Sequence, residues 1–516
     1  MVKTCHVCNG MRVYYLFSNY GHRVVRCDDC GLVFLNPQPG DDELARIHGT
    51  NNFPGGDNEA GRIVVSKAKQ AAARLFLSEI RRYHGFETGR LLEVGCGDGD
   101  FLVLAEAAGW QVTGIEYSPD ACKIAQQRLK NGKVSCGELQ QAGLASEQFD
   151  LCVVSDVIEH DKSPLEFLRE IHRLLKPGGT LMIATPSIDS WSVRFMRQNA
   201  NEFKAGRLTY FDRQTIQTAL FKSGFREIII QAGQKDINAA SGTMIFSRKT
   251  ELRPQPVLSV VIPAFNEAKT FGTLMESLLR KDMAGLQMEI VVVESNSTDG
   301  TREVALKFQD HPKVKLILED QPHGKGHAVR AGFKAASGDY VLIQDADLEY
   351  DLEDYDALLE HLVAGRSAFV LGSRHGGRNV LKMRQFTGQL GLSLFLNLGH
   401  WFFATLINVL FRQRLRDPFT MFKVFRRDCL SGLEFECNRF DFDFELLIKL
   451  IRKGYCPVEL PVNYRSRSFK EGKKVRMWRD PLTWLVALTR LRFSKIDPMK
   501  VVGQRQETEP AANHKP

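Results

Sequence analysis

Three features that would restrict the class of this protein are missing from its sequence. There is no internal repeat, so the two halves of the chain are not copies of one unit. The first ten residues lack the basic and then apolar pattern of a secretory signal, which predicts a cytoplasmic protein. No excess of one charge runs through the chain, because the formal net charge is only +8 over 516 residues. The composition, with 43% apolar and 25% charged residues, excludes global disorder.

The length of the chain exceeds what one hydrophobic core usually supports, and its pattern predicts several domains. After a helical pattern over about 65–85, short apolar runs alternate with helical patterns, which is typical of α/β folds with parallel sheets. The runs are 90–97, 111–117, 149–157 and 179–186 in the first half, and 258–265, 289–295, 314–319, 340–347 and 368–374 in the second. We predict a small module over 1–40, one domain over 41–246, a charged and proline-bearing linker over 247–257, a second domain over 258–495 and a disordered tail over 496–516.

Two CxxC pairs lie in the first 40 residues, with 18 residues between them. In a reducing compartment, clustered cysteines indicate a metal site before disulfides, and four thiolates on two tight turns suit tetrahedral zinc. The sequence therefore predicts a structural zinc ribbon with the ligands Cys5, Cys8, Cys27 and Cys30. The residues between the pairs give a mild basic and aromatic hint of nucleic-acid binding. We predict that the other seven cysteines are core residues.

A glycine-rich turn follows the first predicted strand of the first half, in the segment LEVGCGDG over 92–99. Glycines allow the backbone to approach a cofactor closely where a strand turns into a helix. Glu116 ends the next strand, about 20 residues further on, where a carboxylate can bind ribose hydroxyls. Dehydrogenases use a similar glycine turn, so the surrounding motifs decide between the two classes.

Together with 149–160 and 174–186, these motifs resemble the class I SAM-dependent methyltransferases (SAM, S-adenosylmethionine) over about 90–186, a Rossmann-like fold. The preceding ribbon is similar to ribbons fused to methyltransferases of small-molecule and sugar pathways. The resemblance implies a SAM site formed by Glu93, Gly95, Gly97, Gly99, Glu116, Glu138 and Asp156. Methyl transfer needs alignment of the partners and removal of a proton, and His160 is the candidate base, with a hydrogen-bonded loop histidine as the alternative.

Polar residues follow three of the predicted strands in the second half, at 266–267, 294–299 and 345–349. The carboxyl ends of parallel strands meet at one edge of a sheet, so these groups should converge there. Asp345 and Asp347 form a DxD motif whose hard oxygens suit Mg²⁺ or Mn²⁺ bound to a diphosphate. The pattern predicts a metal-dependent site for a nucleotide-linked donor.

These motifs resemble family 2 glycosyltransferases of the GT-A fold over about 258–467. The resemblance implies a nucleotide-sugar site made by Pro263, Phe265, Glu267, Glu294, Asp345, Ala346, Asp347, Arg374 and Arg384, with Glu349 beside the two aspartates at the metal and Asp347 at the reaction centre. The family usually has two aspartates where this chain has Glu294 and Ser295, so the nucleobase of the preferred donor stays open.

The segments 417–427 and 438–474 resemble the polyprenyl-phosphate branch of that family, which is similar to dolichol-phosphate mannose synthase. An ionised lipid phosphate can attack without a general base, whereas a glycan hydroxyl needs one, for which Asp417, Asp443 and Glu445 are candidates. Eleven Lys or Arg against three acids over 461–500 indicate an anionic partner. We expect Arg465, Arg467 and Lys473 to hold the acceptor phosphate.

No charged residue occurs from 385 to 411, a length that could span a bilayer. A polar stripe recurs at helical spacing within it, formed by Gln389, Ser393, Asn397, His400 and Asn408. This stripe favours a helix in the headgroup layer over a buried or spanning one. A second amphipathic stretch lies at 482–493, and we expect both to hold the protein on the inner face of the membrane.

The resulting hypothesis is a bifunctional enzyme of cell-surface glycan or glycolipid synthesis. It would methylate a sugar or lipid-linked intermediate and transfer a sugar, with inversion, to polyprenyl phosphate. Three alternatives remain. The acceptor could be a glycan hydroxyl, the methyltransferase-like domain could bind RNA without catalysis, or the chain could be a glycosyltransferase whose methyltransferase domain binds SAM without methyl transfer to any glycan intermediate. The sugar, the methyl acceptor and the oligomeric state stay open.

Overall fold

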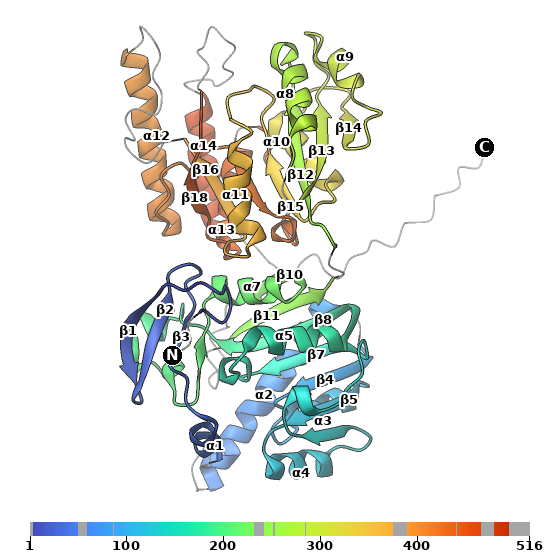
Figure 1. The fold of residues 1–516 in the computed structure, drawn as a ribbon, viewed down its shortest axis with the longest axis vertical. Coiled ribbons are helices and arrows are strands. Elements are labelled where there is room, and N and C mark those ends of the chain that lie inside the picture. Colours follow the sequence, from blue (N-terminus) through green and yellow to red (C-terminus); the bar gives the residue numbers. More distant parts are fainter. Residues whose placement is uncertain are drawn as a thin grey trace, which may run out of the picture. The chain divides into compact units, whose positions relative to one another are not determined.

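A computed structural model of the chain describes residues 4–49, 59–85, 87–231, 242–250, 253–283, 285–374, 390–439, 441–465 and 479–494. The described residues form two compact units, one within residues 1–251 and the other within 252–496. Each unit contains a seven-stranded sheet with helices, and the first also contains a four-stranded sheet (Figure 1). This architecture confirms the predicted α/β fold class.

The large sheet of the first unit has the order β10-β11-β8-β7-β4-β5-β6. Its strands are β4 (Arg90–Val94), β5 (Gln111–Glu116), β6 (Lys133–Cys136), β7 (Phe149–Ser155), β8 (Leu175–Pro186), β10 (Phe225–Gln231) and β11 (Gly242–Lys249). The strands from β6 to β8 are parallel, whereas β11 is antiparallel to both β8 and β10. The order reverses between β4 and β7, and such a reversal opens a crevice for ligands at the carboxyl ends of the strands.

The helices of the first unit pack through apolar residues on this sheet or, in the case of the first and the sixth, beside the ribbon strands. They are α1 (Asp41–Gly49), α2 (Glu59–His84), α3 (Asp100–Ala107), α4 (Pro119–Arg128), α5 (Pro164–Leu174), α6 (Trp191–Met196) and α7 (Arg213–Lys222). In α5, Pro164 occupies the first turn and Phe167, Leu168, Ile171 and Leu174 recur at helical spacing and are buried. Helices α2 and α3 share a core with the sheet, to which Phe76, Phe101 and Phe246 contribute.

The four-stranded sheet contains the ribbon strands β1 (Val13–Asn19), β2 (His22–Cys27) and β3 (Val33–Leu35). Its fourth strand is β9 (Thr209–Tyr210), which pairs antiparallel with β3. The ribbon therefore shares its sheet with a segment of the methyltransferase-like domain, a pairing that the sequence did not predict.

Two local predictions differ from the structure. Strand β11 continues to Lys249, so residues 247–249 are paired strand rather than the start of a linker. Of the seven cysteines predicted as core residues, Cys136 and Cys456 are exposed, and Cys136 is joined to Cys122 by a disulfide. The prediction failed at Cys136 because β6 is an edge strand whose residues are at most half-buried.

The sheet of the second unit has the order β14-β13-β12-β15-β17-β16-β18. Its strands are β12 (Val257–Ala264), β13 (Gln287–Glu294), β14 (Val314–Leu318), β15 (Tyr340–Ile343), β16 (Phe369–Ser373), β17 (Lys423–Arg426) and β18 (Val458–Pro461). The four strands from β14 to β15 are parallel, and β17 runs antiparallel to β15 and β16. This order reverses between β12 and β15, next to the DxD motif.

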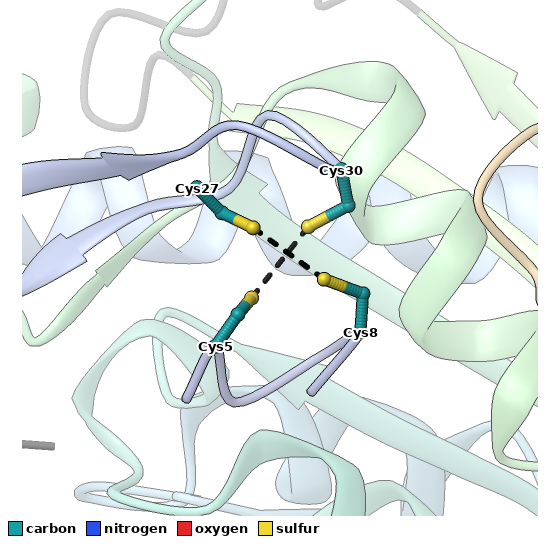
Figure 2. Close-up of side chains that lie close together, drawn as sticks. All are labelled: Cys5, Cys8, Cys27 and Cys30. Carbon is teal, nitrogen blue, oxygen red and sulfur yellow. Dashed lines mark hydrogen bonds between the residues drawn. The ribbon is translucent and has the colours of Figure 1, made fainter. Parts of the chain in front are cut away.

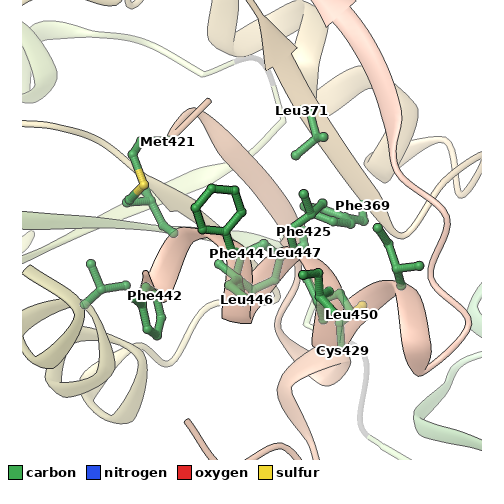
Figure 3. Close-up of a cluster of buried hydrophobic side chains, with 14 of the residues drawn as sticks. Phe369, Leu371, Met421, Phe425, Cys429, Phe442, Phe444, Leu446, Leu447 and Leu450 are labelled. Atoms are coloured by element: carbon green, nitrogen blue, oxygen red, sulfur yellow. The ribbon is translucent and has the colours of Figure 1, made fainter. Parts of the chain in front are cut away.

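The helices of this unit are α8 (Ala268–Arg280), α9 (Thr301–Leu306), α10 (Lys325–Ala335), α11 (Asp354–Val363), α12 (Leu390–Phe411), α13 (Phe442–Arg452) and α14 (Arg479–Phe493). Figure 3 shows side chains of α13, such as Phe444 and Leu447, gathered with Phe369 and Phe425 of the sheet. Helix α13 is buried along nearly its whole length, so it holds the residues of its first turn firmly in place.

The polar stripe on α12 faces the protein, which corrects the prediction that it faces lipid headgroups. Asn397 and His400 are buried, and Asn408 exchanges hydrogen bonds with the backbone of Leu415 at 2.8 Å. Among the described side chains of α12, the exposed large apolar ones are Leu398, Trp401, Phe402 and Val409. Gln389 of the predicted stripe lies outside the described residues. Among the helices within the described ranges, none combines the length and the apolar character needed to cross a bilayer.

Candidate active sites

The four ribbon cysteines converge as the sequence predicts. Their sulfur atoms all lie within 4.8 Å of one another, with Cys5 opposite Cys30 at 3.6 Å and Cys8 opposite Cys27 at 3.4 Å (Figure 2). Four sulfurs at this spacing form a closed tetrahedral set that can hold zinc. Such a set leaves no coordination position for a substrate, so its role is structural.

In the first unit, the glycine turn after β4 leaves space beside its backbone. Gly95, Gly97 and Gly99 all have positive φ angles, of 76°, 52° and 78°. A Cβ atom at Gly95 would come within 2.3 Å of Val157, whereas no atom lies within 4 Å of the Cβ position at Gly97. The turn thus needs glycine for its conformation and leaves one side open where a ligand can approach.

Glu116 is tied to this turn by its carboxylate. It accepts hydrogen bonds from the backbone amides of Gly97 at 2.8 Å and Ser118 at 2.9 Å. Each carboxylate oxygen keeps a second acceptor position for a ligand hydroxyl. Glu138 lies in the next loop, is exposed, and follows Gly137, whose amide donates to the backbone oxygen of Glu116 at 2.9 Å.

Glu93 lies in the buried part of β4, and burial raises the pKa of its carboxyl well above the usual range. The charges of Glu116 and Asp100 raise this pKa further. Among the described residues, one buried oxygen of Glu93 has no hydrogen-bond partner. A buried polar group without a partner is costly, so this oxygen fits a donor group supplied by a bound ligand.

Asp156 and Glu159 form a pair of carboxyls after β7. Burial and the nearby Glu159 raise the pKa of Asp156 to about 6, although 42% of its side chain remains exposed. Glu159 is fully buried and accepts a hydrogen bond from the hydroxyl of Thr185 at 2.9 Å, and burial raises its pKa too. The guanidinium of Arg207 lies 3.8 Å from Asp156 and 3.6 Å from Glu159.

His160, the candidate base, lies in the same loop and is half-buried. Its Nδ1 atom lies 2.9 Å from the backbone oxygen of Gly206. Because a carbonyl oxygen can only accept, Nδ1 carries the proton and Nε2 holds the lone pair of the neutral ring. Burial lowers the pKa of His160, so the neutral and basic form prevails at neutral pH.

In the second unit, the DxD motif follows β15 at the reversal of strand order. Asp345 forms an ion pair of 2.6 Å with Lys325, the first residue of α10. Asp347 accepts a hydrogen bond from the amide of Glu349 at 3.2 Å, and the carboxylate of Glu349 accepts one from the hydroxyl of Tyr464 at 2.7 Å. The buried Ala346 between the aspartates accepts a bond from the hydroxyl of Thr270 at 2.7 Å, which fixes the motif against α8.

Lys325 reaches Asp345 because the start of α10 is packed closely. Gly324 has a φ angle of 102°, and the amide of Gly326 donates to the backbone oxygen of Asn438 at 2.9 Å. A Cβ atom at either glycine would come within 2.4 or 2.6 Å of the backbone at 437–438. Burial opposes the charge of Lys325, but Asp345 and Asp443 raise its pKa.

Several residues predicted for a nucleotide site lie at the neighbouring ends of β12 and β13. Ala264 pairs with Glu294 in the parallel ladder, and Pro263, Phe265 and Glu267 are half-buried at the end of β12. Glu294 is buried, bonded to the amide of Ser297 at 2.7 Å and ion-paired with Arg302. Although burial opposes it, the bonds from Ser297 and Arg302 lower the pKa of Glu294, so this residue is an ionised and paired carboxylate.

Arg374 and Asp417 form a buried bidentate ion pair. The guanidinium donates to the two carboxylate oxygens at 2.8 and 2.7 Å, and the backbone amide of Arg374 donates to one of them at 3.0 Å. Despite burial, these contacts lower the pKa of Asp417 below its usual range. His400 lies 3.9 Å from the same carboxylate.

Asp443, on the first turn of α13, lies in the electrostatic field of the DxD cluster. Burial raises its pKa, the cations Lys423 and Lys325 lower it, and Asp345 raises it. Lys423 of β17 is buried, and burial lowers its pKa to about 8. The cluster therefore combines carboxylates with the cations Lys325, Lys423 and Arg374.

Not all predicted site residues join this cluster. Glu445 accepts hydrogen bonds from Lys449 at 2.7 Å and from the amides of Glu436 and Cys437, which makes it an anchor of that loop. The amide of Arg465 donates to the backbone oxygen of Glu349 at 2.9 Å, which brings Arg465 beside the metal-site acids. Arg384, Arg467 and Lys473 lie outside the described residues.

Sequence reasoning missed three cations at these sites, namely Arg207, Lys325 and Lys423. The glycines on either side of Lys325, at the start of a helical pattern, were a usable signal. No comparable signal marks Arg207 or Lys423, because their partners are distant in sequence.

Comparisons with known proteins agree with both geometries. Residues 66–229 match the family "Methyltransferase domain", and residues 259–431 match "Glycosyl transferase family 2". The chain therefore contains a methyltransferase domain and a family 2 glycosyltransferase domain, which confirms the two resemblances.

Curated relatives match through the glycosyltransferase half. A dolichol-phosphate mannosyltransferase of Pyrococcus furiosus is 31% identical over 216 residues, 42% of this chain and 58% of that protein. A dolichyl-phosphate beta-glucosyltransferase of Saccharomyces cerevisiae is 27% identical over 46% of this chain and 74% of that protein. Glycosyltransferase AglD of Haloferax volcanii is 26% identical over 51% of this chain and 47% of that protein. The chain spans about half of the length of AglD and less than two thirds of the length of the mannosyltransferase.

Solved structures match through the methyltransferase half. A SAM-dependent methyltransferase of Thermotoga maritima, described as a possible histamine N-methyltransferase, is 20% identical, with a TM-score of 0.29 over 36% of this chain and 89% of that one. A SAM-dependent methyltransferase of Archaeoglobus fulgidus is 18% identical, with a TM-score of 0.29 over 34% of this chain and 94% of that one.

Proposed function

We propose that the chain is a bifunctional enzyme that transfers a methyl group from SAM in its first unit and a sugar from a nucleotide sugar to a polyprenyl phosphate in its second. The observation that carries the proposal is that each unit gathers its polar groups where the strand order of its sheet reverses. Both reactions would serve one pathway of cell-surface glycan or glycolipid synthesis, because the two domains share a chain.

The first site fits SAM through its free space and its acceptors. Glu116 would bind the ribose hydroxyls, the open side of Gly97 would receive the cofactor, and the buried oxygen of Glu93 would accept a bond from it. SAM supplies an electrophilic methyl group. The chain's own task is to orient an acceptor and remove its proton, for which Nε2 of His160 is the proposed base. The proposed acceptor is a sugar or a lipid-linked intermediate.

The second site fits a divalent cation through hard oxygen ligands. Asp345, Asp347 and Glu349 would hold Mg²⁺ or Mn²⁺, which offsets the charge of the leaving diphosphate. Arg374 is held in place by Asp417 and would bind phosphate as predicted, while Asp417 acts as its positioning partner.

A phosphate acceptor is supported by the charges around Asp443. Two of the three candidate bases are already engaged, since Asp417 pairs with Arg374 and Glu445 pairs with Lys449. The cations Lys325 and Lys423 suit an anionic nucleophile, which is ionised near neutral pH and needs no base. Two of the similar proteins are named for dolichol or dolichyl phosphate.

A glycan hydroxyl is the second candidate acceptor, and the raised pKa of Asp443 is the observation that favours it. Burial shifts this carboxyl toward the range in which it could take a proton from a hydroxyl. The two acceptors therefore predict different effects of Asp443→Asn, with sugar transfer retained for a phosphate and lost for a hydroxyl.

Membrane attachment is supported by exposed apolar side chains on two helices. Leu398, Trp401, Phe402 and Val409 of α12 and Leu485, Val486 and Phe493 of α14 are exposed. Arg490 and Arg492 accompany the second group and would attract anionic headgroups. We propose that these faces rest in the interface of the inner leaflet, which would bring the enzyme to a lipid-linked acceptor.

The sugar-transfer proposal is tested by incubating the full chain with membranes, Mg²⁺ and a panel of labelled nucleotide sugars, and then extracting lipids. Label in a lipid that mild acid releases is the expected result, because a sugar on a lipid phosphate is acid-labile. Asp347→Asn should abolish labelling, whereas Glu353→Gln, an exposed acid of the same unit, should retain it. Label found only in polymer would overturn the phosphate acceptor.

The methyl-transfer proposal is tested by calorimetric titration of the full chain with SAM. Saturable binding is expected. Absence of SAM binding would instead favour the RNA-binding alternative, which titration with single-stranded RNA would then examine.

A further inference from the structure

The ribbon and the methyltransferase site are connected through residues 200–211. In this segment, β9 extends the ribbon sheet, since Thr209 pairs with Phe34 and Tyr210 with Val33. The backbone amide of Leu35 also donates to the oxygen of Leu208 at 2.9 Å. The segment is thus hydrogen-bonded as a fourth strand of the ribbon.

The same segment is bonded on its other side to the loop of the candidate base. The amide of Leu208 donates to the backbone oxygen of Glu159 at 2.8 Å, and the oxygen of Gly206 lies 2.9 Å from Nδ1 of His160. Leu208 therefore links Leu35 to Glu159 through its own two backbone groups.

Arg207, between these two contacts, faces the acidic pair of the site. Its guanidinium lies within 4 Å of both Asp156 and Glu159. Another nitrogen of the same group donates to the backbone oxygens of Asn201 and Glu202, at 3.1 and 3.2 Å. The fold of the segment itself consequently sets the position of this guanidinium.

Side chains strengthen the contact between ribbon and segment. The side-chain amide of Asn19 donates to the backbone oxygen of Phe203 at 2.7 Å. The rings of Phe17 and Phe203 lie edge to face, with their centroids 5.0 Å apart. A buried cluster joins Val24, Val33 and Leu35 to residues 200–210. Contacts of several kinds thus dock the segment on the ribbon.

We propose that the metal-bound ribbon is a positioning part of the methyl-transfer site, holding residues 200–211 so that Arg207 and Gly206 stay against Asp156, Glu159 and His160. Cys27 ends β2 and Cys30 lies three residues before β3, so the metal would fix the two strands that carry the docking surface. By contrast, Gly97 and Glu116 bond to no ribbon residue among the described contacts. The ribbon should therefore control the acceptor side of the site and leave the SAM side intact.

Hydrogen exchange of the full chain tests this division, with the zinc-loaded protein compared with Cys27→Ser/Cys30→Ser. We expect exchange to quicken about tenfold or more in peptides covering 200–211 and 158–160, because local opening exposes their amides. SAM affinity, measured by calorimetry, should change less than about threefold, because the contacts of Gly97 and Glu116 remain. Unchanged exchange in 200–211 would overturn the proposal, and so would an equal loss of SAM affinity, which indicates general unfolding.

Two further variants leave the cysteines in place. Leu35→Pro removes the amide that bonds to Leu208, and Asn19→Ala removes the bond to Phe203. Both should quicken exchange in 200–211 and change SAM affinity less than about threefold, because the contacts of Gly97 and Glu116 remain. Tyr14→Ala, on an exposed position of β1, is the matched control and should change neither readout. An effect of Tyr14→Ala as large as that of Asn19→Ala would refute a specific contact.

Discussion

Both domains gather polar residues where the strand order of the sheet reverses, but they hold the carboxylates there with different groups. In both, the strand order reverses next to the first strand of the domain, β4 in one and β12 in the other. At the first reversal, the carboxylate of Glu116 is held by two backbone amides. At the second, Asp345 and Asp417 are held by the side-chain cations Lys325 and Arg374.

This difference suits the different ligands. Backbone amides keep a carboxylate in place without neutralising it, so it remains an acceptor for ribose hydroxyls. Side-chain cations neutralise the acids at the second site, and a divalent cation bound there would compete with Lys325 for the carboxylate of Asp345. Under the proposed functions, the first site would therefore offer acceptors to ribose hydroxyls, and at the second a metal would replace Lys325 as the partner of Asp345.

The largest expected effect comes from breaking the Arg374–Asp417 pair. Arg374→Met leaves the buried carboxylate of Asp417 without its main partner, which should lower the free energy of unfolding of the second unit by about 3–5 kcal/mol. Urea unfolding followed by circular dichroism measures the change, with SAM binding as a check that the first unit is intact. Arg280→Met, which removes an exposed ion pair with Glu276, is the control and should have little effect. Equal decreases in the free energy of unfolding would show that the buried pair stabilises the second unit no more than an exposed pair does.

A smaller effect, on SAM affinity, is expected from replacing Glu116, whose carboxylate is held by two backbone amides. Glu116→Gln keeps the shape of the side chain but removes its charge, and its NH₂ group opposes one of the two backbone donors. Because hydrogen bonds to charged groups contribute about 1.5–3 kcal/mol, SAM affinity should fall about 10- to 100-fold. Calorimetry measures this, with Asp120→Asn, an exposed acid at the start of α4, as control. Unchanged affinity would remove Glu116 from the SAM site.

The exchange of charges at Asp345 predicts a third effect. Lys325→Met removes the cation that competes for this carboxylate, so Mn²⁺ should bind about tenfold more tightly without nucleotide, while nucleotide-sugar affinity falls. Electron paramagnetic resonance of free Mn²⁺ measures the first change. Lys315→Met, which breaks a pair with Glu289 away from the DxD motif, should leave Mn²⁺ binding unchanged. Weaker Mn²⁺ binding by Lys325→Met would contradict competition at Asp345.

An element could be predicted from the sequence where its own residues carry the signal, and could not where its place depends on residues distant in sequence. Parallel strands buried on both faces, such as β12, are continuous apolar runs and were predicted. Strand β6 has four residues and only one large apolar side chain, and β17 includes Lys423 and Arg426, which are buried through partners elsewhere. Neither strand therefore carries a local pattern that predicts its place in the sheet.

The site was predictable where its residues follow strands, as Glu116 and Asp345 do, because the topology of a parallel sheet brings strand ends together. The cations come from other elements, and their roles depend on neighbours that the sequence does not reveal. The stripe on α12 shows the same limit. Helical spacing identifies the residues that share a face, but the partner of Asn408 at Leu415 decides which face turns inward.

The smallest expected effect is a shift of the pH profile of methyl transfer. Burial and the charge of Arg207 lower the pKa of His160, so its basic form persists below pH 6.5 and activity should fall only as pH drops through that lowered value. Below pH 6.5, His160 binds fewer protons in the folded protein than in the unfolded chain, so the free energy of unfolding falls as the pH falls. Above pH 6.5 the ring is neutral in both states, and its titration does not change the stability. Arg207→Met removes one of the two causes and leaves Asp156 to raise the pKa, so the acid limb should move to higher pH. Titration of the His160 ring by NMR measures the shift directly, and Arg213→Met, with a side chain outside this cluster, is the control. A shift to lower pH in Arg207→Met would contradict the placement of its guanidinium beside the acidic pair.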